Sequence, residues 1–389
     1  MTPLRLSTYA QAQEALKHAD LAQALYDDAL HVMADALVTL HGADHAQRRA
    51  VEFAVFNRRF FRTYETESFP QTLEPLLQPC LQSGGCDVVA LGYQVTMNLT
   101  ADFAGIDRRL NNAGETATLL RLVKTFSAGA TLAHATGPHE PINAAVDAAM
   151  EEFDELFLRP SVERRRQYMA SAKPLPNDVL SQLLTHDQTA DLPWDVLRRE
   201  MAFYLQAGAH STANSATHAL NEIFNWVQSP AHAHALEPDI VQRCVHESLR
   251  LHPASPVARR KALQALEICG HRVCKGQRVV IDLEAANRDA QVFGADAHRF
   301  NPERSLPARV WPFGLSFGYG IHACLGRDLD GGVVPKPGQP AVHLGIVSLF
   351  VCELLAHRAR PSLEDAPVLD AGTRRSHWGY YPIQFEGVT

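Results

Sequence analysis

The chain has 389 residues, of which 46% are hydrophobic and 20% are charged, and its formal net charge is -7. This length and balance indicate an ordinary globular protein with a large core. The negative net charge argues against nucleic acid as a partner. No run of 18 apolar residues occurs, and residues 1–21 lack a signal-peptide core. We therefore expect a cytoplasmic protein that has no membrane partner.

The predicted elements are mostly helices. Helical patterns occupy residues 9–16, 44–62, 86–104, 115–134, 142–158, 177–186, 193–226 and 237–251. Strand patterns come later, in residues 265–268, 272–273, 277–281 and 378–385. Nothing suggests alternating βαβ units. The pattern predicts a single α-rich α+β domain over residues 1–389, with small β-sheets.

The seven cysteines are scattered along the chain, which does not indicate a disulfide framework. Cys269 and Cys274 flank His271, but their spacing fits no tetrahedral zinc pattern. We expect a hairpin turn around Gly270 at this place.

The most informative segment is the run from Phe317 to Gly326, with the sequence FGYGIHACLG. It places one thiol, Cys324, inside a glycine-rich loop. A thiolate on an open loop can be the axial ligand of a haem iron and push electron density onto it, which favours O–O cleavage. The segment resembles the cysteine-ligand loop of the cytochrome P450 family. The residues that carry the resemblance are Phe317, Gly318, Gly320, His322, Cys324 and Gly326.

The resemblance implies a triangular, mainly helical fold and a haem b cofactor (iron protoporphyrin IX) whose iron is bound by Cys324. A second match is Glu247-x-x-Arg250, followed some fifty residues later by Arg304. Alone, Glu247 and Arg250 would be an ordinary surface pair on one helix face. In the family this order is typical of a structural ion triad. If the triad is buried, removing Glu247 would cost about 3–5 kcal/mol.

A haem carries two propionates, which basic donors must neutralise. Alone, each basic residue would more often be a solvated charge. The family-matching candidates are His45, Arg49, Arg260 and His322. Arg48 and Arg259 are adjacent alternatives, but helical spacing from His45 favours Arg49 and the hairpin register favours Arg260.

The longest predicted helix carries a departure from the family. Its residues Ala207 and Gly208 match the place where the family's distal helix leaves room for dioxygen and substrate. An interior glycine costs about 1 kcal/mol relative to alanine, which indicates a kink or a close approach there. His210 stands where the family has an acid, and Ser211 stands where it has threonine, the pair that supports proton delivery.

Three interpretations of His210 stay open. It could replace the acid in an ordinary oxygenase, because histidine can relay protons near neutral pH. It could belong to an enzyme that uses peroxide or catalyses a non-oxygenase reaction. It could also point away and form a hydrogen bond with the backbone.

Two further departures concern the ends of the matching region. His45 follows only 44 residues, so the chain is N-terminally shortened relative to the family. We expect the first helix and most of the first hairpin to be absent, which would leave the substrate channel open or covered by a partner chain. Behind Cys324, glycines and prolines in residues 331–340 interrupt the expected helix, which restarts near Ala341.

The resemblance implies a monooxygenase that inserts one oxygen atom from dioxygen into an apolar small organic substrate, such as a secondary metabolite or an aromatic compound. No flavin or nicotinamide motif is present, so electrons would come from a separate ferredoxin or flavodoxin system. The alternatives are a peroxygenase, an isomerase or dehydratase, and a non-catalytic haem sensor. Candidate substrate-pocket residues are Phe203, Ala207, Pro256, Val257 and Trp378. The oligomeric state stays open.

Overall fold

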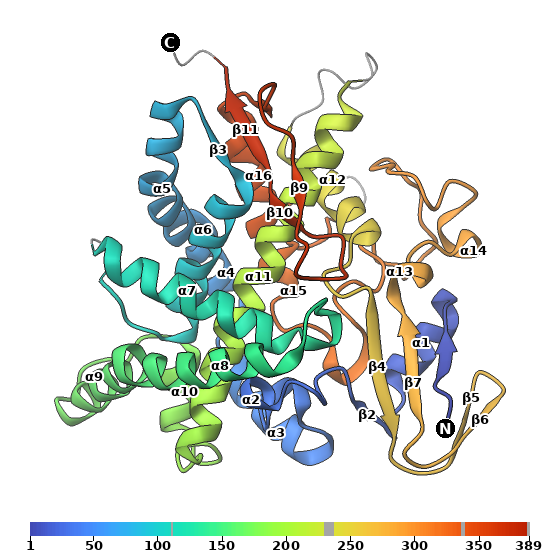
Figure 1. Ribbon diagram of the computed structural model, residues 1–389, viewed down its shortest axis with the longest axis horizontal. Coiled ribbons are helices and arrows are strands. Elements are labelled where there is room, and N and C mark those ends of the chain that lie inside the picture. Colours follow the sequence, from blue (N-terminus) through green and yellow to red (C-terminus); the bar gives the residue numbers. More distant parts are fainter. Residues whose placement is uncertain (110–111, 229–236, 336–338, 387–389) are drawn as a thin grey trace.

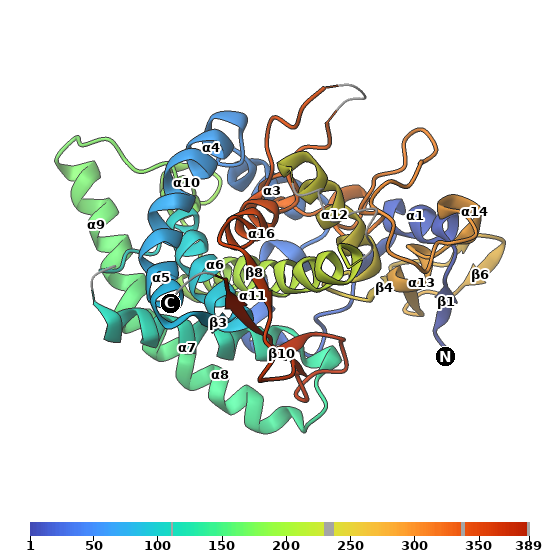
Figure 2. The ribbon, with the colours of Figure 1, turned by 90° about the horizontal axis from the view of Figure 1, so that it is seen from above.

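The computed structural model describes residues 1–109, 112–228, 237–335 and 339–386. Helices gather on one side and a four-stranded sheet lies on the other, with the long helix α11 between them (Figure 1). Viewed from above, α12 and α16 lie on one side of α11, and α7 and α8 lie on the other (Figure 2). This arrangement is the predicted α-rich α+β fold. The single-domain description stays a prediction.

The helices are α1 Tyr9–Lys17, α2 Leu30–Met33, α3 Gly42–Phe53, α4 Arg58–Thr63, α5 Phe69–Ser83, α6 Val88–Ala104, α7 Ala113–Ala130, α8 His139–Phe153, α9 Arg159–Ala170, α10 Val179–Thr185, α11 Trp194–Trp226, α12 Pro238–Leu251, α13 Leu283–Ala286, α14 Ala290–Phe293, α15 Arg327–Asp330 and α16 Ile346–Ala356. Single turns of 3-10 helix occupy Leu37–Thr39, Leu132–His134 and Gly320–His322, and π-helical turns occupy Tyr64–Ser68 and Asp154–Leu158.

The strands are β1 Leu4–Leu6, β2 Leu21–Gln23, β3 Gly85–Asp87, β4 Val257–Ala262, β5 Leu266–Ile268, β6 His271–Val273, β7 Arg278–Asp282, β8 Ala359–Pro361, β9 Val368–Leu369, β10 Trp378–Tyr380 and β11 Pro382–Phe385. The largest sheet has the order β1-β7-β4-β2, in which β1 pairs in parallel with β7 and the other pairs are antiparallel. Two strands from the start of the chain therefore join two strands from its last third.

Helix α11 is the centre of the main hydrophobic core, while a second core lies under the large sheet. Glycines allow α6 to approach α11 closely. A Cβ at Gly208 would lie 2.5 Å from Oγ1 of Thr100, and a Cβ at Gly92 would lie 3.3 Å from that of Ala213. The close approach predicted for Gly208 is confirmed, and α6 is the neighbour that approaches.

Several predicted boundaries were wrong for local reasons. The predicted helix at residues 44–62 is two helices, because α3 ends at Phe53 and Asn57 caps α4 by accepting a hydrogen bond from the Phe60 amide at 3.1 Å. Cys86 lies in β3 instead of at the start of α6. The predicted final strand, residues 378–385, is two strands, β10 and β11.

The segment behind Cys324 is interrupted as predicted. Helix α15 has only 4 residues, and the next helix begins at Ile346, a few residues later than expected. Lys336, Pro337 and Gly338 of the predicted interruption lie outside the described residues. Within the described ranges, none of the helices combines the length and apolar composition needed to cross a bilayer.

Candidate functional site

A cavity of about 340 Å³ lies between α11, α6, α3 and the loop that carries Cys324. Every predicted site residue except His210 lines it. The predicted lining residues are His45, Arg49, Ala207, Gly208, Ser211, Arg260, Phe317, Gly318, His322, Cys324 and Gly326. Segments more than 250 residues apart in the sequence thus supply one concave site.

The loop geometry presents the Cys324 thiol to this cavity. The Cys324 amide donates a hydrogen bond to the Phe317 carbonyl at 2.8 Å, which closes the loop. Gly318 and Gly320 have φ angles of 69° and 70°, a region that favours glycine. A Cβ at Gly320 would also lie 2.5 Å from the Leu16 carbonyl oxygen. These two positions therefore need glycine for the loop to form.

The Cys324 side chain is open to the cavity but lies deep among protein atoms. Burial, assisted by the nearby Asp330 carboxyl, raises the pKa of Cys324 to about 11, while the Gly326 amide and Arg49 act in the opposite direction. By itself the thiol therefore keeps its proton at neutral pH. A metal ion bound at the sulfur would supply the charge that removes that proton.

Four basic side chains face the cavity near this thiol and form no ion pair within the described ranges. Arg49 donates to the Ala323 carbonyl at 2.7 Å, and Arg260 donates to Gln23 Oε1 at 2.8 Å. The rings of His45 and His322 lie 4.5 Å apart between centroids. Both ring nitrogens of His322 are buried without a hydrogen-bond partner in the described structure. Among the described residues, none of the four basic groups meets a carboxylate.

Burial disfavours positive charge on all four of these groups. Burial lowers the pKa of Arg260 to about 10, that of His45 to about 4 and that of His322 to about 3. Anionic groups placed in the cavity would stabilise the positively charged forms of these side chains. The two carboxylates of a haem fit such a donor set, and the thiol of Cys324 fits its iron.

The alternative donor Arg48 points elsewhere. Its Nη1 lies 2.7 Å from Oε2 of Glu200, and both side chains are buried. Arg48 therefore neutralises an acid of α11, which agrees with the preference for Arg49 at the cavity.

The predicted ion triad is buried and complete. Arg250 is 0% exposed and donates to both carboxylate oxygens of Glu247 at 2.7 Å. Arg304 Nη2 reaches Glu247 Oε1 at 3.1 Å, and its Nη1 reaches Asp296 Oδ1 at 2.6 Å. The Asn301 amide also donates to Glu247 Oε1, at 3.0 Å. This network joins α12 to the segment before the cysteine loop.

Comparison with known proteins supports the same family as this geometry. Residues 138–329 match the family model described as Cytochrome P450. The "Putative cytochrome P450 140" of Mycobacterium tuberculosis (strain ATCC 25618 / H37Rv) is 34% identical over 159 residues, which are 39% of this chain and 34% of that relative. The chain belongs to the cytochrome P450 family.

Two longer matches cover more of the chain, one in sequence and one in fold. The "Steroid C26-monooxygenase" of Mycolicibacterium smegmatis is 25% identical over 308 residues, which are 78% of this chain and 65% of the relative. The solved structure of CalO2 has a TM-score of 0.77 at 20% identity and covers 99% of this chain and 91% of its own. The first curated relatives are thus matched over about a third of their length, whereas the fold is matched almost throughout.

His210 departs from what the P450 resemblance implied. The hydroxyl of Tyr93 is hydrogen-bonded to its Nδ1, and Arg375 Nη2 lies 2.7 Å from its Nε2. A guanidinium only donates, so Nε2 accepts and the ring is the neutral tautomer with a proton on Nδ1. Burial, with a smaller contribution from Arg375, lowers the pKa of His210 to about 3.

The expectation that His210 handles protons at the cavity is therefore corrected. The side chain is absent from the cavity lining and both its nitrogens are engaged. Of the three interpretations, the one in which it points away is nearest, although its partners are side chains instead of backbone. Ser211 does line the cavity, and its hydroxyl donates to the Ala207 carbonyl at 2.6 Å.

Sequence reasoning missed a buried acid cluster beside the P450 cavity. Glu52 and Glu200 are both 0% exposed, and the Tyr204 hydroxyl, which lines the cavity, donates to Glu52 Oε2 at 2.5 Å. Burial raises the pKa of both carboxyl groups above the ordinary range, and the charge of Glu200 raises that of Glu52 further. Arg48 and Glu52 stand four residues apart on α3, and this spacing was the available signal.

Three other cavity residues, Thr212, Asp330 and Tyr26, were also missed. Thr212 lines the cavity and donates to Asp330 Oδ1 at 2.5 Å, and burial raises the pKa of Asp330 to about 6. Tyr26 lines the cavity as well. Of the predicted substrate-pocket residues, Phe203, Ala207 and Val257 line the cavity, whereas Pro256 and Trp378 are not among its lining residues.

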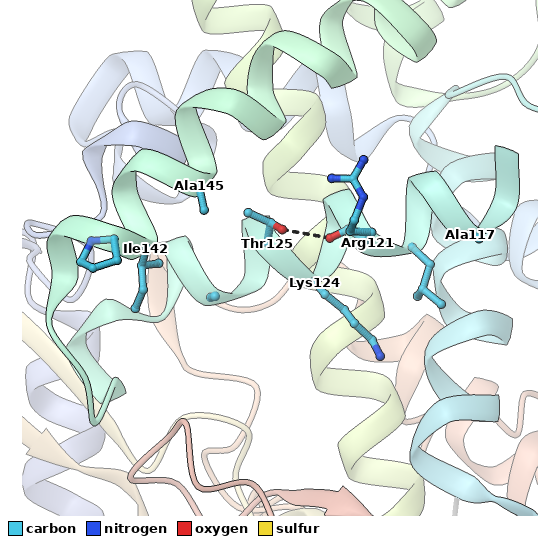
Figure 3. Close-up of a pocket in the computed structure, with 9 residues that line it drawn as sticks. Ala117, Arg121, Lys124, Thr125, Ile142 and Ala145 are labelled. Atoms are coloured by element: carbon cyan, nitrogen blue, oxygen red, sulfur yellow. Dashed lines mark hydrogen bonds between the residues drawn. The ribbon is translucent and has the colours of Figure 1, made fainter. Parts of the chain in front are cut away.

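A second, more open hollow of about 640 Å³ lies between α7 and α8 (Figure 3). Its lining contains no predicted site residue. Thr125 donates there to the Arg121 carbonyl at 3.0 Å, and Lys124 lies 4.9 Å above the ring of Tyr93. This hollow shares no lining residue with the cavity that holds Cys324.

Proposed function

We propose that this P450 is a haem-thiolate monooxygenase that inserts one oxygen atom from dioxygen into an apolar small organic molecule. The observation that carries the proposal is the meeting of Cys324 with four basic side chains that lack ion-pair partners among the described residues. A relative named "Steroid C26-monooxygenase" agrees with this reaction class.

The chain offers each donor that haem b requires. Cys324 Sγ would bind the iron, and four basic residues would neutralise the propionates, namely His45, Arg49, Arg260 and His322. Phe317, Gly318 and Gly326 shape the loop around the sulfur. Bound in this way, the haem supplies dioxygen activation, which thiolate ligation favours.

The residues of α11 leave space and hold a proton beside that position. Ala207 and Gly208 present no large side chain to the cavity. Within the described ranges the Ser211 hydroxyl donates to a helix carbonyl alone, so it can turn toward a cavity acceptor without leaving a buried carboxylate unpaired. Thr212, by contrast, is held by Asp330. We therefore assign proton transfer at the cavity to Oγ of Ser211, with His210 as a positioning residue that holds Arg375.

The proposal includes an external reductant and an apolar substrate. The sequence has no flavin or nicotinamide motif, so a ferredoxin or flavodoxin system would deliver the electrons. Apolar side chains from several elements line the cavity, among them Val38, Leu99, Phe103, Phe203 and Val257. Such walls favour a hydrophobic substrate over a sugar or nucleotide.

A second candidate is a haem-thiolate enzyme that uses peroxide or catalyses an isomerisation or dehydration. One observation favours it. The α11 position where the family carries an acid holds a neutral histidine whose nitrogens are both engaged, so no carboxylic acid serves the cavity from that position.

Turnover with labelled dioxygen separates the two candidates. The holoenzyme is supplied with a ferredoxin or flavodoxin reductase system and oxygen-18 gas, and in parallel with peroxide alone. The monooxygenase proposal expects one labelled oxygen atom in the product and no turnover without dioxygen. Product without label, formed equally well in anaerobic buffer, would contradict it and favour the second candidate.

A further inference from the structure

Arg375 is a buried cation that has no counter-ion among the described residues. Its side chain precedes β10 and is 8% exposed. Its donors reach three neutral acceptors, namely Thr373 Oγ1 at 3.2 Å, the Ala254 carbonyl at 3.3 Å and His210 Nε2 at 2.7 Å. In the described part of the chain it forms no ion pair, and Asp370 acts on it only through its field. Burial lowers the pKa of Arg375 to about 10, so it stays charged at neutral pH.

Such an arrangement is costly unless a ligand completes it. An unpaired buried charge is disfavoured strongly, and proteins usually pair it or let it meet a ligand. The neighbouring histidines supply no negative charge to pair with Arg375. The side chains of His134, His210 and His377 are all held neutral, because burial and the charge of Arg375 lower their pKa values.

Arg375 lies directly behind the wall of the cavity that holds Cys324, although it is not itself among the lining residues. Ala254, whose carbonyl it contacts, and the adjacent Ser255 both line that cavity. Tyr26 lines it too, and burial raises the pKa of Tyr26 whereas the charges of Arg260 and Arg375 lower it. No hydrogen bond engages the Tyr26 hydroxyl among the described residues, so it is a free donor at the cavity that feels the charges of both Arg260 and Arg375.

We propose that Arg375 and Tyr26 bind a carboxylate of the substrate at this end of the cavity. The inference rests on the proposed function, because it concerns the substrate of the same site. Arg49 and Arg260 are already assigned to the haem propionates, which leaves the charge of Arg375 for the substrate. One guanidinium and one phenol match a monoanion, whereas a dianion would leave excess negative charge in a buried place.

The same proposal explains His210. A carboxylate at this position of α11 would pair with Arg375 and neutralise it. A neutral histidine instead accepts one hydrogen bond through Nε2, fixes the orientation of the guanidinium and leaves its charge intact. His210 is thus a positioning residue for the anion site, and the family's acid is absent because it would compete with the ligand.

The test compares each acid with its own amide. Straight-chain acids from octanoic to hexadecanoic acid, phenyl-substituted propanoic acids and the primary amide of each are titrated into the holoenzyme. Binding is followed by the spectral change of the haem and, independently, by the shift in thermal midpoint. We expect the best acid to bind about tenfold or more tighter than its amide, as a charge-assisted hydrogen bond requires.

Variants of the protein test which residues cause the preference for acids over amides. Arg375→Met should abolish it, and His210→Asp should remove most of it by neutralising Arg375. His210→Asn, which keeps a neutral acceptor, should retain it. Arg374→Met is the matched control, because Arg374 is the exposed neighbour, and it should behave as wild type. Tyr26→Phe should weaken acids more than amides.

The outcomes are distinct. Equal binding of acids and amides, binding of neither, tighter binding of alkyl phosphates, or a preference that survives Arg375→Met would each overturn the inference. If the ferrous–CO spectrum shows thiolate ligation but no acid preference appears, the proposed function stands and only this inference is lost. If acids shift the thermal midpoint of a protein that lacks the thiolate spectrum, the proposed function is lost instead.

Discussion

Two buried guanidinium groups of this P450 have opposite surroundings. Arg250 is fully buried and bonded to both oxygens of Glu247, and its Nη1 donates to the carbonyls of Asn287 and Ala297 at 2.6 Å. Arg375 is almost as buried, yet all its acceptors are neutral. The first charge is neutralised within the fold, so its role is architectural. The second is left uncompensated beside a cavity, so it can serve a ligand.

The largest effect on stability is expected in the buried ion network of Glu247, Arg250 and Arg304. Glu247→Gln removes the carboxylate that Arg250 and Arg304 share, leaving two buried cations without their common partner. We predict a loss of about 3–5 kcal/mol in the free energy of unfolding, measured by urea denaturation of the holoenzyme.

The control for this variant is Glu284→Gln. Glu284 pairs with Arg288 at 3.2 Å on the surface, and we expect a change of about 0.3–0.5 kcal/mol. Equal effects of the two substitutions would show that the buried triad is no more than an ordinary ion pair.

An intermediate effect is expected at the acid cluster beside Tyr204. Glu200→Gln leaves Arg48 without its carboxylate and should cost about 1.5–3 kcal/mol. Glu52→Gln replaces a carboxyl group whose pKa burial raises well above its ordinary value, and it should change stability by less than about 1 kcal/mol at ~pH 7. Urea midpoints of both variants at that pH check the contrast.

The pH dependence of the same pair has a definite sign. Burial raises the folded pKa of both carboxyl groups above the unfolded value, so their protonation stabilises the fold fully below the ordinary glutamate range. That contribution is lost as the pH rises through the folded pKa of each group. Glu52→Gln should therefore gain stability relative to wild type as the pH rises from the ordinary glutamate range toward the raised folded pKa of Glu52. A constant difference across this range would contradict the assignment.

The smallest effect on stability is predicted for Arg375, the buried cation whose acceptors are all neutral. Arg375→Met replaces an uncompensated buried cation with an apolar side chain of similar length. We expect ligand-free stability to change by less than about 1 kcal/mol, or to rise, because no carboxylate is left behind. Arg250→Met is the comparison, since it strands Glu247. Thermal and urea midpoints that fall equally in both variants would contradict the view that the charge of Arg250 is neutralised within the fold and that of Arg375 is not.

The sequence predicted what depends on local pattern. The long helices and the cysteine loop were found because their residues lie close together in the chain. Strands β1 and β2 were missed because each has 3 residues and pairs with β7 or β4 from far along the chain. Helix α5 was missed because Pro75 and Pro79 interrupt its pattern.

The same limit applies inside the site. Cys324, Arg49, Arg260 and Ser211 could be placed on the cavity from spacing and resemblance. The orientation of His210 could not, because its partners Tyr93 and Arg375 are 117 and 165 residues away. Side-chain direction on a buried helix depends on such distant neighbours, and one sequence does not reveal which of them meet.

The most direct measurement is the ferrous–CO spectrum of wild type and Cys324→Ser, with Cys274→Ser as a control at an exposed cysteine. If Cys324 is the axial thiolate, wild type and Cys274→Ser will show the red-shifted band of thiolate-bound haem, and Cys324→Ser will lose it. A red-shifted band that persists unchanged in Cys324→Ser would contradict thiolate ligation by Cys324 and, with it, the proposed function.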